Sequence, residues 1–399
     1  MNFANKKVLL RVDFNVPLDQ NGNITDDTRI TAALPTIKKL LENNNAVILM
    51  SHLGRPMKNL LEDGSINKEK FTLKHLVDHL SSLLNLRVQF ASDTVGEEAR
   101  EKAEFLKSGE VLLLENTRFN KGEETGDEEL AKQLSLLGDV FVNDAFGTAH
   151  REHASTATVA KYFESSEKDF GLLMGKEIKN VTLVLKTTEL PYTAVIGGAK
   201  VSDKILLIKK VMKKASQILI GGGMAYTFIK AEGGEVGNSL VEEEKIALAK
   251  SLLDSAPNNN CVFQLPVDSI VADKFDKNAN TKVVDSYAIP DGWMGLDIGP
   301  KAKSIYALLV ENSKTILWNG PMGVFEMEKF AAGTRAIAHA AAYATQHNYA
   351  YSLIGGGDSV AAVNQTGMQN TVSFVSTGGG ALLEFLEGKD LPGIAAIKA

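Results

Sequence analysis

The side chains best suited to bind anions lie in the first half of this chain, and the glycine clusters lie in the second half. Seven of the eight arginines occur within the first 151 residues, and only Arg335 follows them. Every run of adjacent glycines comes after residue 190. An arginine binds carboxylates and phosphates through a rigid fork of donors, whereas glycine-rich turns let backbone N–H groups approach a phosphate. The division suggests two half-sites, one for a small anion and one for the phosphates of a nucleotide.

Polar residues of the first half cluster where predicted strands end. Arg11, Asp13 and Asn15 alternate along RVDFN, so they are expected on one side of a strand, although Asp, Asn and Pro also favour a simple turn. His52 and Arg55 follow the next apolar run in SHLGRP. A histidine alone is more often structural. Arg118 in LENTRF and Arg151 in GTAHRE take equivalent positions. Several arginines at the strand ends of one sheet predict a pocket for a small anion with two or three charges.

The glycine runs of the second half fit neither a P-loop nor a dinucleotide fingerprint. Lys200 and Lys204 are one helical turn apart in GGAKVSDK, so we expect them on one face at a helix start, facing two phosphates. Asp358 follows a glycine turn and suits a Mg²⁺ that arrives with the nucleotide. Glycines 378–380 lead into a short helix whose amides could face a transferring phosphate. Glu326 is available to a ribose hydroxyl.

Short apolar runs alternate with amphipathic stretches along the whole chain. In the first half they are residues 6–14, 45–51, 86–91, 110–116 and 139–146, and in the second 192–198, 216–223, 261–268, 315–320, 351–357 and 371–380. Helical patterns, such as residues 31–42 and 72–84, lie between them. Near-continuous apolar strands separated by helices indicate parallel sheets covered on both faces. We therefore expect an α/β fold with two doubly wound, Rossmann-like lobes, joined by a connecting helix over residues 170–186.

Length and composition exclude several classes of protein. A chain of 399 residues is expected to form two domains. Its net charge of −6 argues against a nucleic-acid partner. No apolar run reaches the roughly 18 residues that span a bilayer, and the first residues carry no signal-peptide pattern, so we expect no membrane partner and a cytoplasmic location. The single Cys261 begins an apolar run and is expected to be a buried structural thiol.

The order of these motifs resembles that of phosphoglycerate kinases over essentially the whole chain. The motifs are RVDFNVP, SHLGRP, LENTRF, DAFGTAHR, GGAKVSDK, IGGGMAYTF, GWMGLDIGP, WNGPMGVFE, IGGGDS and STGGGA. The resemblance implies reversible phosphoryl transfer between ATP and the carboxylate of 3-phosphoglycerate, giving ADP and 1,3-bisphosphoglycerate, with Mg²⁺ carried by the nucleotide. It also implies a monomer with a glycerate domain over residues 1–172 and a nucleotide domain over 173–387, which close like a hinge over a cleft. Residues from about 388 to 399 are expected to pack back on the first domain.

The resemblance also implies roles for individual residues. The glycerate site would contain Asp13, Phe14, Asn15, Arg29, His52, Leu53, Gly54, Arg55, Arg118 and Arg151. The nucleotide site would contain Gly198, Lys200, Lys204, Gly222, Gly295, Asn319, Glu326, Gly356, Gly357, Asp358 and Ser359, with Asp358 as the metal ligand. Catalysis would fall to Arg29, Lys200 and Gly379.

Three features depart from the pattern of that family. The chain begins closer to RVDFN than is usual, Glu152 follows Arg151 where a small residue is common, and Gly175 interrupts the connecting helix where a charged residue is common. Two other functions remain as alternatives. One is a non-catalytic protein with two lobes that senses a phosphorylated acid, and the other is a nicotinamide dehydrogenase, for which the fingerprint is missing.

Overall fold

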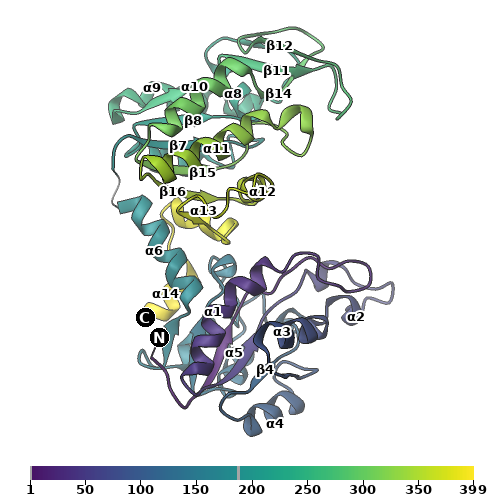
Figure 1. The fold of residues 1–399 in the computed structure, drawn as a ribbon. Helices are drawn as coiled ribbons and strands as arrows, with labels where there is room; N and C mark the ends of the chain where they lie inside the picture. Colours follow the sequence, from purple (N-terminus) through teal and green to yellow (C-terminus); the bar gives the residue numbers. More distant parts are fainter. Residues whose placement is uncertain (1, 187–188) are drawn as a thin grey trace. The chain divides into compact units, whose positions relative to one another are not determined.

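Each half of the chain is built on a parallel sheet of six strands in this computed structural model, which describes residues 2–186 and 189–399 (Figure 1). Unit 1 runs to Lys179 and also contains Lys389–Ala399, and unit 2 comprises Asn180–Gly388. The predicted α/β class with two parallel sheets is confirmed. We expected the domains to divide between residues 172 and 173, whereas the compact units divide inside helix α6 (Leu172–Lys186). The helix predicted over 170–186 is thus present.

The six strands of unit 1 were largely predictable from apolar runs. They are β1 (Lys7–Arg11), β2 (Ala46–Met50), β3 (Val88–Phe90), β4 (Val111–Leu113), β5 (Val140–Asn143) and β6 (Lys168–Phe170). They lie in the order β3-β4-β2-β1-β5-β6, and all neighbours are parallel. The sequence analysis missed β6, because its three residues are only half-buried and contain no apolar run.

Alternate residues of these strands supply two cores on opposite faces of the sheet. Val8 and Leu10 belong to one apolar cluster, together with residues of α1 (Thr28–Glu42) and α3 (Val77–Leu84). Leu9 belongs to a second cluster, together with residues of α4 (Glu97–Phe105) and α5 (Glu128–Ser135). Successive side chains of a strand point to opposite faces. Covering both faces therefore requires the near-continuous apolar runs that the sequence contains.

The C-terminal end of the chain completes unit 1. Helix α14 (Pro392–Lys398), yellow in Figure 1, packs against β6 and the 3-10 helix η5 (Thr158–Tyr162). The Nδ2 atom of Asn143 donates a hydrogen bond of 3.3 Å to the carbonyl oxygen of Gly393. The other helices of this unit are α2 (Lys68–Phe71), η1 (Pro56–Lys58), η2 (Leu73–Leu76), η3 (Thr117–Phe119) and η4 (Phe146–Thr148).

Unit 2 repeats the parallel design. Its main strands are β7 (Tyr192–Ile196), β8 (Gln217–Ile220), β10 (Val262–Gln264), β15 (Thr315–Asn319), β16 (Tyr351–Gly355) and β17 (Phe374–Val375), in the order β10-β8-β7-β15-β16-β17. The helices are α7 (Ile205–Met212), α8 (Met224–Ala231), α9 (Ile246–Ser255), α10 (Pro300–Glu311), α11 (Ala332–His347), α12 (Gly357–Gln365) and α13 (Gly380–Leu386), with η6 (Glu243–Lys245), η7 (Pro257–Asn259) and η8 (Glu328–Phe330). Trp318 of β15 is fully buried in a core with residues of α10 and α11.

Two small sheets in unit 2 were not predicted. β11 (Asp268–Ala272) pairs antiparallel with both β12 (Thr281–Asp285) and β14 (Met294–Ile298), and β9 (Glu235–Val236) pairs with β13 (Ala288–Ile289). The run 261–268, expected as one strand, ends as β10 at Gln264 and is followed by a turn before β11. Most of β12 is exposed, so it has no apolar run that would reveal it.

Two further expectations concern Cys261 and membrane-spanning segments. Cys261 is buried, and this burial raises the pKa of its thiol to about 11, as expected for a structural cysteine. Among the described residues, no helix has the length and apolar character needed to cross a bilayer.

Replacing Gly175 by alanine is expected to stabilise helix α6. A Cβ added at this position meets no atom within 4 Å, and a glycine inside a helix costs about 0.5–1 kcal/mol relative to alanine. The free energy of unfolding in urea should therefore rise by about that amount in Gly175→Ala.

A matched control for this substitution is Gly333→Ala in α11. There the added Cβ would lie 2.4 Å from Oδ1 of Asp297, so this variant should lose stability. If Gly175→Ala changes neither the free energy of unfolding nor the turnover, Gly175 does not loosen the helix.

Candidate functional site

The predicted ligands of unit 1 follow the central strands of its sheet. β1 lies between β2 and β5. The strands that follow it directly in the chain, β2, β3 and β4, lie on one side of β1, and the later strands β5 and β6 lie on the other side. Ligands of open α/β sheets bind beyond the carboxyl ends of the strands at such a switch point. Asp13, His52 and Arg118 follow β1, β2 and β4 respectively.

Asp13, Arg29 and His52 form the centre of this site. The Nη1 atom of Arg29 donates to Oδ2 of Asp13 at 2.5 Å. The Nδ1 atom of His52 lies 4.0 Å from Oδ1 of the same carboxylate. The side chains of Asp13 and His52 are 10% and 5% exposed, whereas that of Arg29 is 39% exposed. Arg29 is thus held by Asp13 at one side and open to solvent at the other.

The peptide segment Leu53–Gly54 is fixed by residues of two loops, those that follow β1 and β4. Gly54 donates its N–H to Oδ1 of Asn15 at 2.8 Å, and its carbonyl oxygen accepts from Nη1 of Arg118 at 2.7 Å. The N–H of Leu53 donates to Oδ1 of Asn116 at 3.2 Å. Gly54 has a φ of +63°, and a Cβ there would lie 2.5 Å from the ring of Phe71. This glycine of SHLGRP is therefore required by the fold.

The positive charge of the site comes from its arginines and not from its histidines. Burial, followed by the charges of Arg11, Arg118 and Arg29, holds the pKa of His52 well below its usual range. Burial and nearby arginines, Arg118 first, lower the pKa of His153 to about 3. Both imidazoles are therefore neutral near pH 7. Arg55 and Arg151 are exposed at the edges, and Arg55 lies close enough for its charge to act on Arg118.

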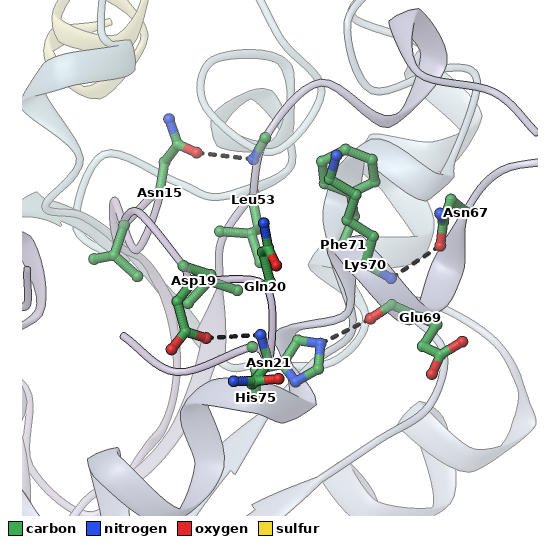
Figure 2. A pocket seen from close by; sticks show the side chains of 14 residues that line it. Asn15, Asp19, Gln20, Asn21, Leu53, Asn67, Glu69, Lys70, Phe71 and His75 are labelled. Atoms are coloured by element: carbon green, nitrogen blue, oxygen red, sulfur yellow. Dashed lines mark hydrogen bonds between the residues drawn. The ribbon is translucent and has the colours of Figure 1, made fainter. Parts of the chain in front are cut away.

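A cavity of about 680 Å³ adjoins this cluster (Figure 2). Asn15, Leu53 and Gly54 line one part of it, and all three are among the residues that the family resemblance implies for the glycerate site. The other lining residues include the charged Asp19, Glu69 and Lys70, and none of the arginines lines the cavity. The cavity is thus a neighbour of the arginine cluster, with polar, charged and apolar walls.

In unit 2 the loops that follow β7 and β15 touch through glycines. A Cβ on Gly197 would lie 2.0 Å from the carbonyl oxygen of Pro321, and one on Gly320 would lie 2.1 Å from that of Gly197. Gly222, after β8, has a φ of +68° and would meet the backbone of Gly198 at 2.6 Å. These glycines bring the ends of the central strands together, as close backbone packing requires.

Lys204 lies against the end of β15. Its Nζ donates to Oδ1 of Asn319, and Nδ2 of Asn319 donates to the carbonyl oxygen of Gly355 at 3.0 Å. Burial lowers the pKa of Lys204, and the carboxylates of Asp203 and Asp358 oppose this effect. The expectation that Lys200 and Lys204 share a helix face is wrong, since α7 begins only at Ile205.

The remaining predicted residues of unit 2 differ in exposure. Asp358 is exposed in the first turn of α12, and Glu326 is exposed after β15. Ser359 is buried, and its Oγ accepts from the N–H of Gly320 at 2.6 Å. Gly295 packs on Tyr226, whose hydroxyl would be 1.9 Å from an added Cβ.

Two of the predicted site glycines of this unit face open space. Gly357 and Gly379 begin or precede α12 and α13, and a Cβ at either would meet no atom within 4 Å. Space for a ligand is thus present beside both positions.

Comparison with known proteins decides the family. A sequence model of the phosphoglycerate kinase family matches residues 1–389. The chain belongs to the phosphoglycerate kinase family. A phosphoglycerate kinase of Chloroherpeton thalassium is 51% identical over 397 residues, which cover 100% of this chain and 97% of that protein. The cytosolic phosphoglycerate kinase 3 of Arabidopsis thaliana is 51% identical over 392 residues, covering 98% and 95%.

Solved structures agree with this family. The phosphoglycerate kinase of Coxiella burnetii matches with a TM-score of 0.89 and 43% identity, covering 100% of this chain and 97% of that one. The enzyme of Pyrococcus horikoshii matches with a TM-score of 0.79 and 34% identity, covering 100% and 97%. The chain is thus a phosphotransferase that moves a phosphoryl group between ATP and 3-phosphoglycerate in glycolysis. Kinases of this family use ATP with Mg²⁺.

Three side chains near the phosphoglycerate kinase motifs have roles that alternation along a strand did not predict. Arg11 is fully buried and does not share an open face with Asp13 and Asn15. Phe14 is also fully buried, in the core beside α1, and its N–H donates to Oγ of Ser51 at 2.8 Å. Asp144, which follows β5, accepts at Oδ1 from the N–H of Met174 at 3.0 Å and thereby caps α6.

Asp144 is expected to ionise near neutral pH, because burial raises the pKa of its carboxyl to about 7. This pKa lies above that of an unfolded aspartate. Asp144 therefore adds its full contribution to the free energy of unfolding below about pH 4, and this contribution falls as the pH rises through 7. Between about pH 5 and 8, the free energy of unfolding should fall less for Asp144→Asn than for the unchanged protein.

The ionisation of Asp144 can be followed directly. Its side-chain carbonyl resonance, assigned by comparison with Asp144→Asn, should shift near pH 7. A shift centred near about pH 4 would mean that burial does not hold the proton.

Proposed function

We propose that unit 1 binds 3-phosphoglycerate and unit 2 binds the Mg-nucleotide. The observation that supports the first assignment is the arginine cluster beyond β1, β2 and β4, in which the histidines are neutral and Asp13 is paired with Arg29. Such a cluster carries excess positive charge, which suits an acid with a phosphate and a carboxylate. The proposed ligands are Asp13, the backbone of Phe14, Asn15, Arg29, His52, Leu53, Gly54, Arg55, Arg118 and Arg151.

The glycine loops of unit 2 support the second assignment. Lys204 is held by Asn319, close to the glycine turn of Gly356 and Gly357, and Gly357 has open space beside it. We assign the base and sugar to loops containing Gly198, Gly222, Gly295, Asn319 and Glu326, and the phosphates to Lys200, Lys204 and residues 356–359.

Asp358 suits the Mg²⁺ ion of the nucleotide. Magnesium is commonly bound by one or two carboxylates together with substrate phosphates, and Asp358 offers an exposed carboxylate at the start of α12. When bound, the ion neutralises charge on the phosphates.

The chemistry requires charge neutralisation more than proton transfer. The accepting group is a carboxylate, already an anion at neutral pH, so no general base is needed. Arg29 and Lys200 would stabilise the charge on the transferring phosphoryl group, together with the backbone N–H groups at Gly379. Transfer in line also requires the two substrates to approach, so we expect the two units to close like a hinge over a cleft during turnover.

Two finer properties are also proposed. We expect a monomer, because the substrates of this reaction can be bound by the two units of one chain. We also expect a cytoplasmic location, which the cytosolic name of the Arabidopsis relative supports.

The assignment of Lys200 is tested by its effect on the chemical step. Lys200→Ala should lower kcat about a hundredfold or more, as expected for the loss of one donor that stabilises the transition state. The affinity for ATP should change far less. Lys209→Ala, at an exposed position of α7, serves as the matched control. Equal losses in kcat and nucleotide affinity would contradict this role.

The assignment of the two units is tested by the substrate whose KM changes. Arg118→Met should raise the KM for 3-phosphoglycerate roughly tenfold or more, because a hydrogen bond to a charged group is lost. The KM for ATP should stay near its original value. Arg87→Met removes an exposed arginine from the same unit and should change neither. A rise confined to the KM for ATP would exclude unit 1 as the glycerate site.

A further inference from the structure

Arg11 lies behind His52, and its guanidinium has partners on all sides. The residue is fully buried at the end of β1. Its Nε donates to Oγ of Ser155 at 2.8 Å, and its Nη1 donates to the carbonyl oxygen of Val12. Its Nη2 lies 3.3 Å from Nδ1 of His52. Each of the three guanidinium nitrogens thus has a partner within the unit.

The charge of Arg11 is balanced inside the unit. Ser155 donates from Oγ to Oε1 of Glu123 at 2.6 Å, and from its N–H to Oε2 at 3.0 Å. Both Ser155 and Glu123 are fully buried. Burial lowers the pKa of Arg11, and the charge of Glu123 opposes that effect. Because an arginine side chain stays protonated in proteins, Glu123 acts as its buried counter-ion through Ser155.

In the contact between Arg11 and His52, only Arg11 can be the donor. A guanidinium has donors and no acceptor. The Nδ1 atom of His52 must therefore accept, and a neutral imidazole that accepts at Nδ1 carries its proton on Nε2.

We propose that Arg11 is a positioning residue that fixes His52 as the Nε2–H tautomer. A neutral histidine then offers a permanent donor, on the ring edge away from Arg11, to an anionic oxygen of the bound acid. The use of this donor rests on the proposed glycerate site.

Asp13 is the group that competes with Arg11 for a hydrogen bond to Nδ1 of His52. A carboxylate favours a protonated Nδ1, and Oδ1 of Asp13 lies 4.0 Å from that atom, beyond hydrogen-bonding distance. Its other oxygen accepts from Arg29 at 2.5 Å. Arg29 thus holds the Asp13 carboxylate, and Arg11, at 3.3 Å, is the nearer partner of the ring nitrogen. Removing Arg11 would leave Asp13 as the group that selects the tautomer.

Nitrogen NMR of ¹⁵N-histidine-labelled enzyme tests the proposal directly. The chain has seven histidines, and the His52→Gln variant identifies the signals of His52. In the unchanged enzyme at neutral pH, Nε2 should give a protonated-type resonance and Nδ1 an unprotonated one. In Arg11→Met the Nδ1–H tautomer should appear. Arg100→Met, which removes an exposed arginine of the same unit, should keep the original pattern.

The kinetic consequence should be specific to one substrate. With Nε2 no longer a permanent donor, the KM for 3-phosphoglycerate should rise about tenfold in Arg11→Met, the size of one hydrogen bond. The KM for ATP should be retained. Ser155→Ala provides the control for stability, because it weakens the link to Glu123 but leaves the donor of Arg11 in place. It should lower the melting temperature and keep the Nε2–H tautomer.

Several outcomes would overturn the proposal. A protonated Nδ1 in the unchanged enzyme would do so even if Arg11→Met does not fold. A folded Arg11→Met enzyme with an unaltered tautomer, or with equal rises in both KM values, would also contradict it. The glycerate site itself is tested separately, by adding 3-phosphoglycerate to the unchanged enzyme. If the His52 signals do not respond, that site is wrongly assigned, while the tautomer result still decides the role of Arg11.

Discussion

The parallel arrangement of the strands is the constraint on which the rest of this structure depends. In each six-stranded sheet all neighbouring strands run the same way, so their carboxyl ends lie on one edge. The loops at that edge carry Asp13, His52 and Arg118 in unit 1, and Lys204, Asn319 and Asp358 in unit 2. Residues that are far apart in sequence therefore gather without any special contact between them. The apolar faces that stabilise the sheets and the polar edge that binds substrates are consequences of the same topology.

The sequence predicted the positions of most strands because buried parallel strands need continuous apolar runs. The sequence could not predict how deeply each polar side chain is buried. Alternation placed Arg11 on the same side as Asp13, but Arg11 is fully buried, with Ser155 and His52 as partners. Asp144 presents a related problem, since a carboxylate after a strand can bind a ligand or cap a helix. Only the position of α6 distinguishes the two. Lys200 precedes its helix because residues 202–204 form a turn and Ser202 bonds to Glu242.

The glycine runs contained two kinds of glycine that look identical in sequence. Gly197, Gly222 and Gly355 have neighbours within 2.6 Å of an added Cβ, so these positions serve close packing. Gly357 and Gly379 face open space. Packing brings the strand ends together, and the open positions leave room for a ligand. A run of glycines after a strand therefore needs a structure before its members can be assigned to binding.

The two proposed half-sites would hold phosphate in different ways, which would account for the split of arginines and glycines. The proposed site of unit 2 combines glycine turns with Lys200 and Lys204. The proposed site of unit 1 depends on arginine side chains, and a crowded set of arginines repels itself unless some of the charge is compensated. Glu123 compensates Arg11 from the inside, and Asp13 holds Arg29 at the surface. The histidines contribute no charge, because burial and the nearby arginines keep them neutral. What remains uncompensated faces solvent, where an anionic substrate can supply the missing charge.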